Sequence, residues 1–180
     1  MKKYEFTGET KVWLGRTLHR IRAVIAFGDI AVGDLGGWIE KEENLAHDGV
    51  AWVYDEAQVY DKARVYGDAQ VYGKAQVYGK AQVCGEAQVY DKARVKNSCH
   101  YLTVGLIGSR NDTTTFFRTK SLEIFVACGC FRGNIEQFAE AVKKRHAGTK
   151  HEKVYLAAIE LAKLQIDLTE EDGERKDNDL

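Results

Sequence analysis

A six-residue phrase, Ala-x-Val-x-(Gly/Asp/Asn)-x, repeats eight times without a gap between Ala51 and Lys96. A fixed short period means that each unit must stack on its neighbours, because no single unit can bury its own apolar side chains. On an extended segment, Ala and Val lie two residues apart and face one way, while the residue that follows each faces the other way. The next position holds only Gly, Asp or Asn, which tolerate the left-handed backbone of a sharp bend. The period therefore predicts short straight sides joined by tight corners around an interior of Ala and Val.

The same repeat predicts ladders of outward-facing aromatic side chains. Three six-residue sides make an 18-residue coil, so residues 18 apart should stack in adjacent coils at roughly 4.7–4.9 Å. Stacked rings and amides can satisfy one another along such a ladder. Tyrosine is also favoured at interfaces, and so many outward tyrosines make a larger apolar surface than a monomer normally exposes. The second interpretation, which we prefer, is therefore an oligomer that packs through these faces. The interface residues would be those of the two tyrosine ladders, Tyr54, Tyr72 and Tyr90 on one side and Tyr60 and Tyr78 on the next; the third side, with Tyr66 and Cys84, is weaker.

The segment before the repeat is expected to lead into it. Residues 1–38 read as a β-rich leader or cap with alternating apolar and polar residues. The β-helix is predicted to span residues 39–98. Ile39 and Leu45 lie twelve and six residues before Ala51, which places them on the same inward track as Ala51.

After the repeat, residues 99–168 are predicted to form a small α+β domain that caps the open end of the β-helix. Residues 101–107 form a strand, and residues 113–119 and 122–130 form a hairpin. Two helices follow, each with a capping-box-like start, at Asn134 and at Thr149. The polar residues 169–180 have no apolar pattern and are expected to be a disordered tail.

Composition limits the possible partners. The 26 basic and 27 acidic side chains give a net charge of −1, and no polybasic tract stands out, which argues against a nucleic-acid polymer as partner. The sequence has no apolar run long enough to span a bilayer, and its first residues have no signal-peptide apolar region, so no membrane association is expected. The 4 cysteines are too few for a disulfide framework and fit a reducing cytoplasm.

The repeat resembles the hexapeptide-repeat proteins, and this resemblance implies a left-handed parallel β-helix of triangular cross-section. Gly33-Asp-Leu-Gly-Gly-Trp-Ile-Glu and Ala51-Trp-Val-Tyr-Asp-Glu-Ala are similar to phage- and prophage-encoded, acetyltransferase-like members. Gly108-Ser-Arg-Asn-Asp and Cys128-Gly-Cys-Phe-Arg-Gly look like the small C-terminal domain of phage members. The fold class implied is mainly β, with a small α+β C-terminal domain. The resemblance also implies a homotrimer in the host bacterial cytosol.

Catalysis is one function that the resemblance implies. Many hexapeptide-repeat proteins transfer acetyl groups from acetyl-CoA, and they need a general base, usually histidine. The candidates are His47 before the regular coils and His100 just after them. No loop interrupts the coils between Ala51 and Val95, whereas the enzymes commonly extrude one over the substrate, so the coils look like scaffold.

The segment from Gly108 to Lys120 is the preferred candidate for ligand binding. It combines a glycine turn, a run of hydroxyls and three cations, a mixture that suits a phosphate or another oxyanion, and Phe116 or Phe117 could stack on a base. The alternative is a polar turn that begins a hairpin, with Phe117 in the core. The candidate binding residues are Ser109, Arg110, Asn111, Thr113, Thr114, Thr115, Arg118 and Lys120.

The spacing of the cysteines and histidines after the repeat argues against a zinc site. Cys99-His100, Cys128-Gly-Cys130, His146 and His151 occur in the same domain. Cys-x-Cys lacks the longer spacer that usually lets two thiolates reach one metal, and alternation places both thiols on one apolar face. No metal and no resident cofactor are expected.

Three function classes follow. The first is a non-catalytic, trimeric binding protein of phage origin that takes up a small anionic, nucleotide-type ligand such as a cyclic nucleotide, in an anti-defence role. The second is an acyltransferase that uses acetyl-CoA. The third is a structural or assembly element.

Overall fold

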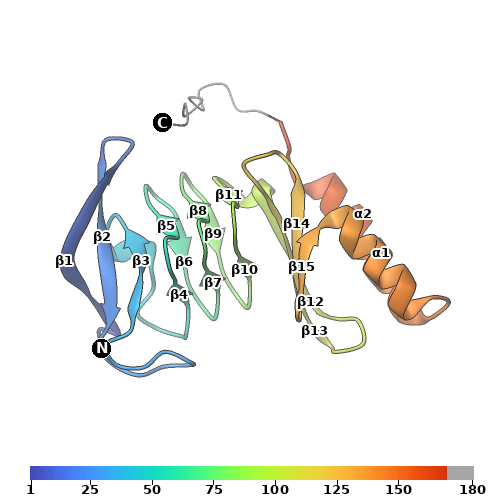
Figure 1. Ribbon diagram of the computed structural model, residues 1–180, viewed down its shortest axis with the longest axis horizontal. Coiled ribbons are helices and arrows are strands. Elements are labelled where there is room, and N and C mark those ends of the chain that lie inside the picture. The colour runs from blue at the N-terminus through green and yellow to red at the C-terminus, as the bar shows by residue number, and fades with distance from the viewer. Residues whose placement is uncertain (170–180) are drawn as a thin grey trace.

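The computed structural model describes residues 1–169 as three parts in a row: an N-terminal hairpin, a β-solenoid and a C-terminal cap (Figure 1). The predicted tail, residues 169–180, lies outside the described residues except for Thr169. No helix within the described part of the chain is long and apolar enough to cross a membrane.

The solenoid consists of eight two-residue strands, one in each six-residue unit. They are β4 (Trp52–Val53), β5 (Gln58–Val59), β6 (Arg64–Val65), β7 (Gln70–Val71), β8 (Gln76–Val77), β9 (Gln82–Val83), β10 (Gln88–Val89) and β11 (Arg94–Val95). The strands pair in parallel at an interval of 18 residues, as in Trp52–Gln70–Gln88 and Gln58–Gln76–Arg94. The predicted parallel β-helix with an 18-residue coil is confirmed.

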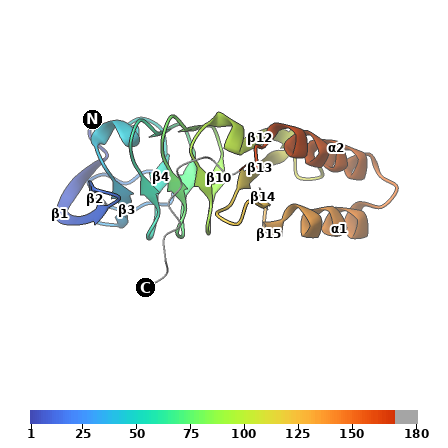
Figure 2. The ribbon, with the colours of Figure 1, turned by 90° about the horizontal axis from the view of Figure 1, so that it is seen from above.

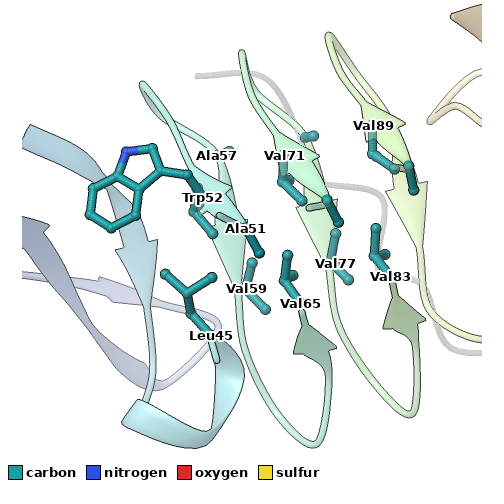
Figure 3. Close-up of a cluster of buried hydrophobic side chains, with 14 of the residues drawn as sticks. Leu45, Ala51, Trp52, Ala57, Val59, Val65, Val71, Val77, Val83 and Val89 are labelled. Atoms are coloured by element: carbon teal, nitrogen blue, oxygen red, sulfur yellow. The ribbon is translucent and has the colours of Figure 1, made fainter. Parts of the chain in front are cut away.

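The interior of the solenoid contains the Ala and Val of the repeat. Every repeat Ala from Ala51 to Ala93 and every repeat Val from Val53 to Val95 is at most 1% exposed, and Figure 3 shows the valines pointing inward from all sides. At the corners, Asp55, Asp61 and Asp91 adopt φ angles of 51°, 64° and 57°, and the corner glycines also have positive φ. The sharp bends predicted from residue type are therefore present in the first seven units. The eighth corner was predicted wrongly, since Asn97 has an extended backbone with φ −148° and its side chain caps the 3-10 helix that begins at Ser98.

The N-terminal segment covers one end and one side of the solenoid. Strands β1 (Tyr4–Trp13) and β2 (Arg16–Ala23) form an antiparallel hairpin, and β3 (Leu35–Ile39) connects it to the coils in a sheet of order β1-β2-β3-β5-β8-β11. A short 3-10 helix, η1 (Glu42–Asn44), follows. Trp52 is fully buried, with its ring near those of Tyr4 and Phe27.

The first coil differs from the predicted register. Ile39 pairs with Val59 and Leu45 bridges Val65, so both are buried at Val positions of the repeat, whereas the sequence placed them at Ala positions. Paired residues are therefore 20 positions apart in the first coil, whereas they are 18 positions apart in the regular coils. Gly49 already lies against Gly67, 18 residues later, because a Cβ on Gly49 would contact Gly67. The regular spacing is therefore restored at Gly49, and the two extra residues lie between Leu45 and Gly49. The insertion includes His47.

The C-terminal cap is a sheet with two helices on its outer face. After η2 (Ser98–His100), strands β12 (Tyr101–Ile107), β13 (Asp112–Arg118), β14 (Ile124–Cys128) and β15 (Phe131–Asn134) form an antiparallel sheet in chain order. Helices α1 (Ile135–His146) and α2 (Lys150–Gln165) lie beside each other beyond this sheet (Figure 2). Both predicted caps are present, since Asn134 accepts from Gln137 N and Thr149 accepts from Glu152 N.

Alternation along β13 places the sheet between two cores. Phe117 packs into the solenoid core, whereas its neighbour Phe116 packs against the helices. Thr115 accepts a hydrogen bond from the backbone N–H of Gln88, 3.0 Å away, and Tyr90 donates to the Val126 carbonyl at 3.1 Å. The cap therefore closes the open end of the solenoid.

Candidate functional site: a cationic cavity in the C-terminal cap

A cavity of about 120 Å³ lies in the cap between the β12–β13 turn, the β14–β15 turn and α1. Its polar lining comes from Ser109, Arg110, Arg145, His146 and Tyr155. Its apolar lining comes from Phe131, Phe138, Ala141 and Val142, with the thiols of Cys128 and Cys130 beside them. No Asp or Glu of residues 1–169 lines it, so the cavity combines an apolar wall with positive charge.

The turn at Gly108 positions Ser109 and Arg110 against the helices. Gly108 has a φ of +76°, and a Cβ there would lie 1.8 Å from the Tyr155 hydroxyl, so glycine is required for this close approach. Burial raises the pKa of Tyr155 to about 12, with a further contribution from the Cys128 thiol and an opposing one from hydrogen bonds with Ser109. The phenol therefore stays protonated at neutral pH and remains available as a donor.

Two arginines supply the charge of the cavity. Arg110 lies over the Gly129 turn and its Nη1 donates to Cys130 Sγ at 3.9 Å. Arg145 reaches the cavity from α1, one helical turn beyond Ala141 and Val142, on the same face. Arg110 and Arg145 are both exposed to solvent. The ring of His146 lies 5.7 Å from that of Tyr155. Guanidinium groups beside an apolar wall can hold a small oxyanion that carries an apolar group.

Comparison with known proteins identifies the central part of the chain. Residues 57–73, which contain β5, β6 and β7, match the family model of the YdcK β-solenoid repeat. Together with the parallel pairing at 18-residue intervals, this match shows a β-solenoid built from six-residue repeats. A relative in Escherichia coli (strain K12), named "Uncharacterized acetyltransferase YdcK", is 33% identical over 64 residues. That match covers 31% of this chain and 20% of the relative, so the chain spans about a fifth of that protein.

The β-solenoid protein brings two of the eight predicted ligand residues, Ser109 and Arg110, to the cavity. The hydroxyls of Thr113 and Thr115 face the solenoid. The Thr113 hydroxyl donates a hydrogen bond to the Glu86 carboxylate, and the Thr115 hydroxyl accepts one from the Gln88 backbone. Thr114 and Arg118 are buried on the opposite face, against Cys128 and His100. Asn111 is exposed in the turn, and Lys120 is exposed beyond β13 with its backbone N–H bonded to Lys92. The predicted set therefore does not converge on one point.

Neither candidate base lines the cavity of the cap. His47 stacks on Tyr4 at 4.3 Å, accepts from the Lys3 backbone at 3.3 Å, and has its pKa lowered by burial. His100 is 0% exposed; its Nδ1 accepts from Lys96 N at 3.2 Å and Arg118 Nη1 lies 2.9 Å from its Nε2. Both rings join the ends of the solenoid to the segments that cover them.

The tyrosine ladders form as predicted, but the chain itself covers part of them. Tyr60 stacks on Tyr78 at 5.3 Å and Tyr72 on Tyr90 at 5.6 Å. Tyr60 is 4% exposed beneath the N-terminal hairpin, and Tyr90 is 8% exposed beneath the cap. Tyr54, Tyr72 and Tyr78 are half-buried. The aromatic surface open to a second copy is thus smaller than the repeat alone suggests.

The cysteines and histidines considered for zinc do not form one cluster, although Cys128, Cys130 and His146 all line the cavity. Cys99 lies beside His100 at the solenoid end, whereas Cys128 and Cys130 line the cavity. The rings of His146 and His151 are 5.9 Å apart on α1 and α2. Within residues 1–169, no group of three or more His, Cys, Asp or Glu side chains could hold a metal ion.

The helical half of the cavity was missed from sequence. Phe138, Ala141, Val142 and Arg145 recur at intervals of three and four residues, which places Arg145 at the edge of the apolar face of α1. This periodicity was the available signal. It does not reveal that the same face meets Arg110, because that depends on how the sheet and helix pack.

Proposed function

We propose that this protein is a non-catalytic binding protein that sequesters a small anionic ligand in the cavity of its cap. The observation that carries the proposal is the cavity itself, in which Arg110 and Arg145 flank an apolar wall and no carboxylate of residues 1–169 is among the lining residues. Guanidinium groups at a concave apolar surface favour a ligand with both an anionic and an apolar part.

The size of the cavity narrows the ligand class. Its volume of about 120 Å³ is well below the roughly 300–1,000 Å³ of most drug-sized ligand pockets. A phosphate or carboxylate with one small ring or a short chain fits, whereas a cyclic dinucleotide would extend beyond the cavity. The nucleotide-type ligand expected from the sequence therefore becomes, in this proposal, a compact phosphate- or carboxylate-bearing molecule.

The surroundings of the two histidines support binding without turnover. A general base must come within hydrogen-bond reach of the group that it deprotonates. His100 is fully buried and engaged by Arg118, and His47 is stacked against Tyr4. Neither ring lines the cavity.

The proposed oligomer is a homotrimer with the solenoids side by side. The side formed by β6 and β9 supports this, since Arg64 and Gln82 are exposed there while the hairpin and the cap cover parts of the other two sides. Sedimentation equilibrium tests it: a trimer is expected, and a monomer at micromolar concentration would contradict it.

Isothermal titration calorimetry with a defined panel tests the binding proposal. The panel contains inorganic phosphate, small aryl carboxylates, mononucleotides and cyclic dinucleotides. Arg110→Gln and Arg145→Gln should each weaken the best-binding compound at least about tenfold, because each removes a charge-assisted hydrogen bond. Lys120→Gln is the matched control, since it removes an exposed cation outside the cavity. No heat with any compound, or equal losses in all three variants, would refute the proposal.

An acyltransferase remains the second candidate, favoured by the name of the Escherichia coli relative. Acetyl-CoA would then bind between solenoids, and His47 or His100 would serve as base. Calorimetry with coenzyme A and a thiol-release assay on His47→Gln and His100→Gln test it. If the unaltered protein neither binds coenzyme A nor releases thiol, this candidate is excluded.

A further inference from the structure

The turn between α1 and α2 concentrates positive charge. Residues 143–153 read Lys-Lys-Arg-His-Ala-Gly-Thr-Lys-His-Glu-Lys and contain one acidic residue, Glu152. Lys143, Lys144, Arg145, Lys150 and Lys153 are all exposed. Five permanent cations in one turn contrast with a net charge of −1 for the whole chain. The near-balanced total charge of the chain conceals this local excess, so the expectation that the chain has no polybasic tract was wrong here.

The fold brings these cations together at one end of the molecule. The last turn of α1 and the first turn of α2 adjoin because the helices run antiparallel, and both views place their connection at the end farthest from the N-terminal hairpin (Figures 1 and 2). Glu152, whose carboxylate accepts from the Gly148 backbone at 2.7 Å, offsets only one of these cations and leaves the cluster strongly positive. This basic tip, residues 143–153, is thus a protruding cationic surface.

Neither local helix stability nor ion pairing explains the whole cluster. Cations in the last turn of α1 interact favourably with the helix dipole, which accounts for Lys143 and Lys144. Lys150 and Lys153 lie in the first turn of α2, where the dipole disfavours positive charge. None of the ion pairs described within residues 1–169 includes a residue of the tip.

We infer that the basic tip binds the phosphate backbone of double-stranded nucleic acid without reading its sequence. A duplex presents a regular row of phosphates, and Lys and Arg that neutralise them release condensed counterions. The aromatic rings of the tip are those of His146 and His151, which are half-buried, and Tyr155 behind them is 4% exposed. Because no Phe, Tyr or Trp ring is exposed there for stacking on unpaired bases, a duplex backbone fits better than a single strand. Between the two helices, Ala147 is the only apolar residue, and it gives little to insert into a membrane.

This interaction is independent of the proposed cavity ligand. Arg145 contributes to both surfaces, whereas Lys143, Lys144, Lys150 and Lys153 do not line the cavity. A variant that replaces only these four lysines therefore tests the tip and leaves the cavity intact. Calorimetry of the cavity ligand with the same variant should show unchanged affinity.

Fluorescence anisotropy with labelled random-sequence DNA and RNA duplexes provides the test. Replacing Lys143, Lys144, Lys150 and Lys153 with Gln should lower affinity at low salt at least about tenfold. The slope of log affinity against log salt should fall by about one for each lysine that contacts a phosphate. The DNA and RNA arms show which duplex supplies the backbone.

The matched control replaces Lys62, Lys74, Lys80 and Lys92, four exposed lysines at solenoid corners, with Gln. This variant has the same change in charge and should retain duplex affinity within about twofold. Circular dichroism confirms that both variants fold. Equal losses in both variants, no binding by the unaltered protein, or binding only to anionic lipid vesicles would each overturn the inference.

Discussion

In the solenoid the inward and corner positions of the six-residue unit carry the fold, whereas in the cap a group of exposed cations contributes little to the packing. Solenoid Ala and Val fill the interior, and Gly and Asp form the corners. Outward Tyr residues stack on each other. The cap also uses β13 to close the solenoid, but it leaves Arg110 and Arg145 beside a cavity and a row of lysines at its tip. Groups that are not needed for folding are the better candidates for function, which directs attention to the cap.

The largest expected effect comes from placing a charge inside the solenoid. Val83→Asp buries a carboxylate at a position that is 0% exposed, among Ala and Val side chains that offer no hydrogen bonds. The free energy of unfolding should fall by about 4 kcal/mol or more. Urea denaturation measures it, with Gln82→Asp as the control on the same strand. Since Gln82 is exposed, its substitution should change stability by less than about 0.5 kcal/mol. Similar losses would show that the two faces are not distinct.

Neighbouring phenylalanines in β13 test how the two regions are coupled. Phe117→Ala removes packing from the solenoid core, and Phe116→Ala removes it from the helical core. Each should cost about 3–5 kcal/mol. We expect Phe117→Ala to increase hydrogen exchange in the last coils, and Phe116→Ala to increase it in α1 and α2. If both variants give one identical exchange pattern, the cap and the solenoid form a single cooperative unit.

Two glycines with similar backbone conformation separate backbone strain from close packing. Gly85 at a solenoid corner has a φ of +63° with no atom within 4 Å of an added Cβ, whereas at Gly108 that Cβ would overlap Tyr155. Gly85→Ala should cost about 1–2 kcal/mol, from left-handed strain alone. Gly108→Ala should cost more and should also abolish ligand binding in the cavity. Thermal unfolding measures both, and equal costs would argue against the tight contact in the cap.

The smallest effect is a dependence of stability on alkaline pH. Burial raises the pKa of Tyr90, at the junction of solenoid and cap, and of Tyr155, within the cap, to about 12 from the usual 10. The folded state keeps these phenols protonated, so their contribution is complete below pH 10 and is lost as pH rises toward 12. Tyr90→Phe and Tyr155→Phe should each reduce this loss. Tyrosinate absorbance checks the titration, and a midpoint near pH 10 for both residues would contradict it.

Much of the solenoid was predictable because its contacts are local and repeated. Residue type and spacing predict the 18-residue register and the inward Ala and Val. They also predict most of the corners and the N-terminal capping residues of α1 and α2. The register of the first coil was not predictable, since two additional residues before Gly49 shift Ile39 and Leu45 to Val positions. Only pairing with the next coil reveals such a shift.

The candidate site was predicted less well. Thr113, Thr114 and Thr115 are adjacent in sequence, but strand alternation and packing on both faces of β13 send their hydroxyls to different partners. Arg145 lies 35 residues after Arg110, and the two meet at one cavity because α2 packs against β12 while α1 packs against α2, β14 and β15.

The sequence by itself determined that the chain forms a β-solenoid, because a six-residue period can bury its Ala and Val only by coiling and stacking. Tertiary structure decided which outward tyrosines remain accessible, how the cap closes the last coil, and which cations converge. These features depend on contacts between segments far apart in the chain, and no local pattern of residues encodes them. The period thus specifies the scaffold, and the packing of the cap determines where charge is left available for a ligand.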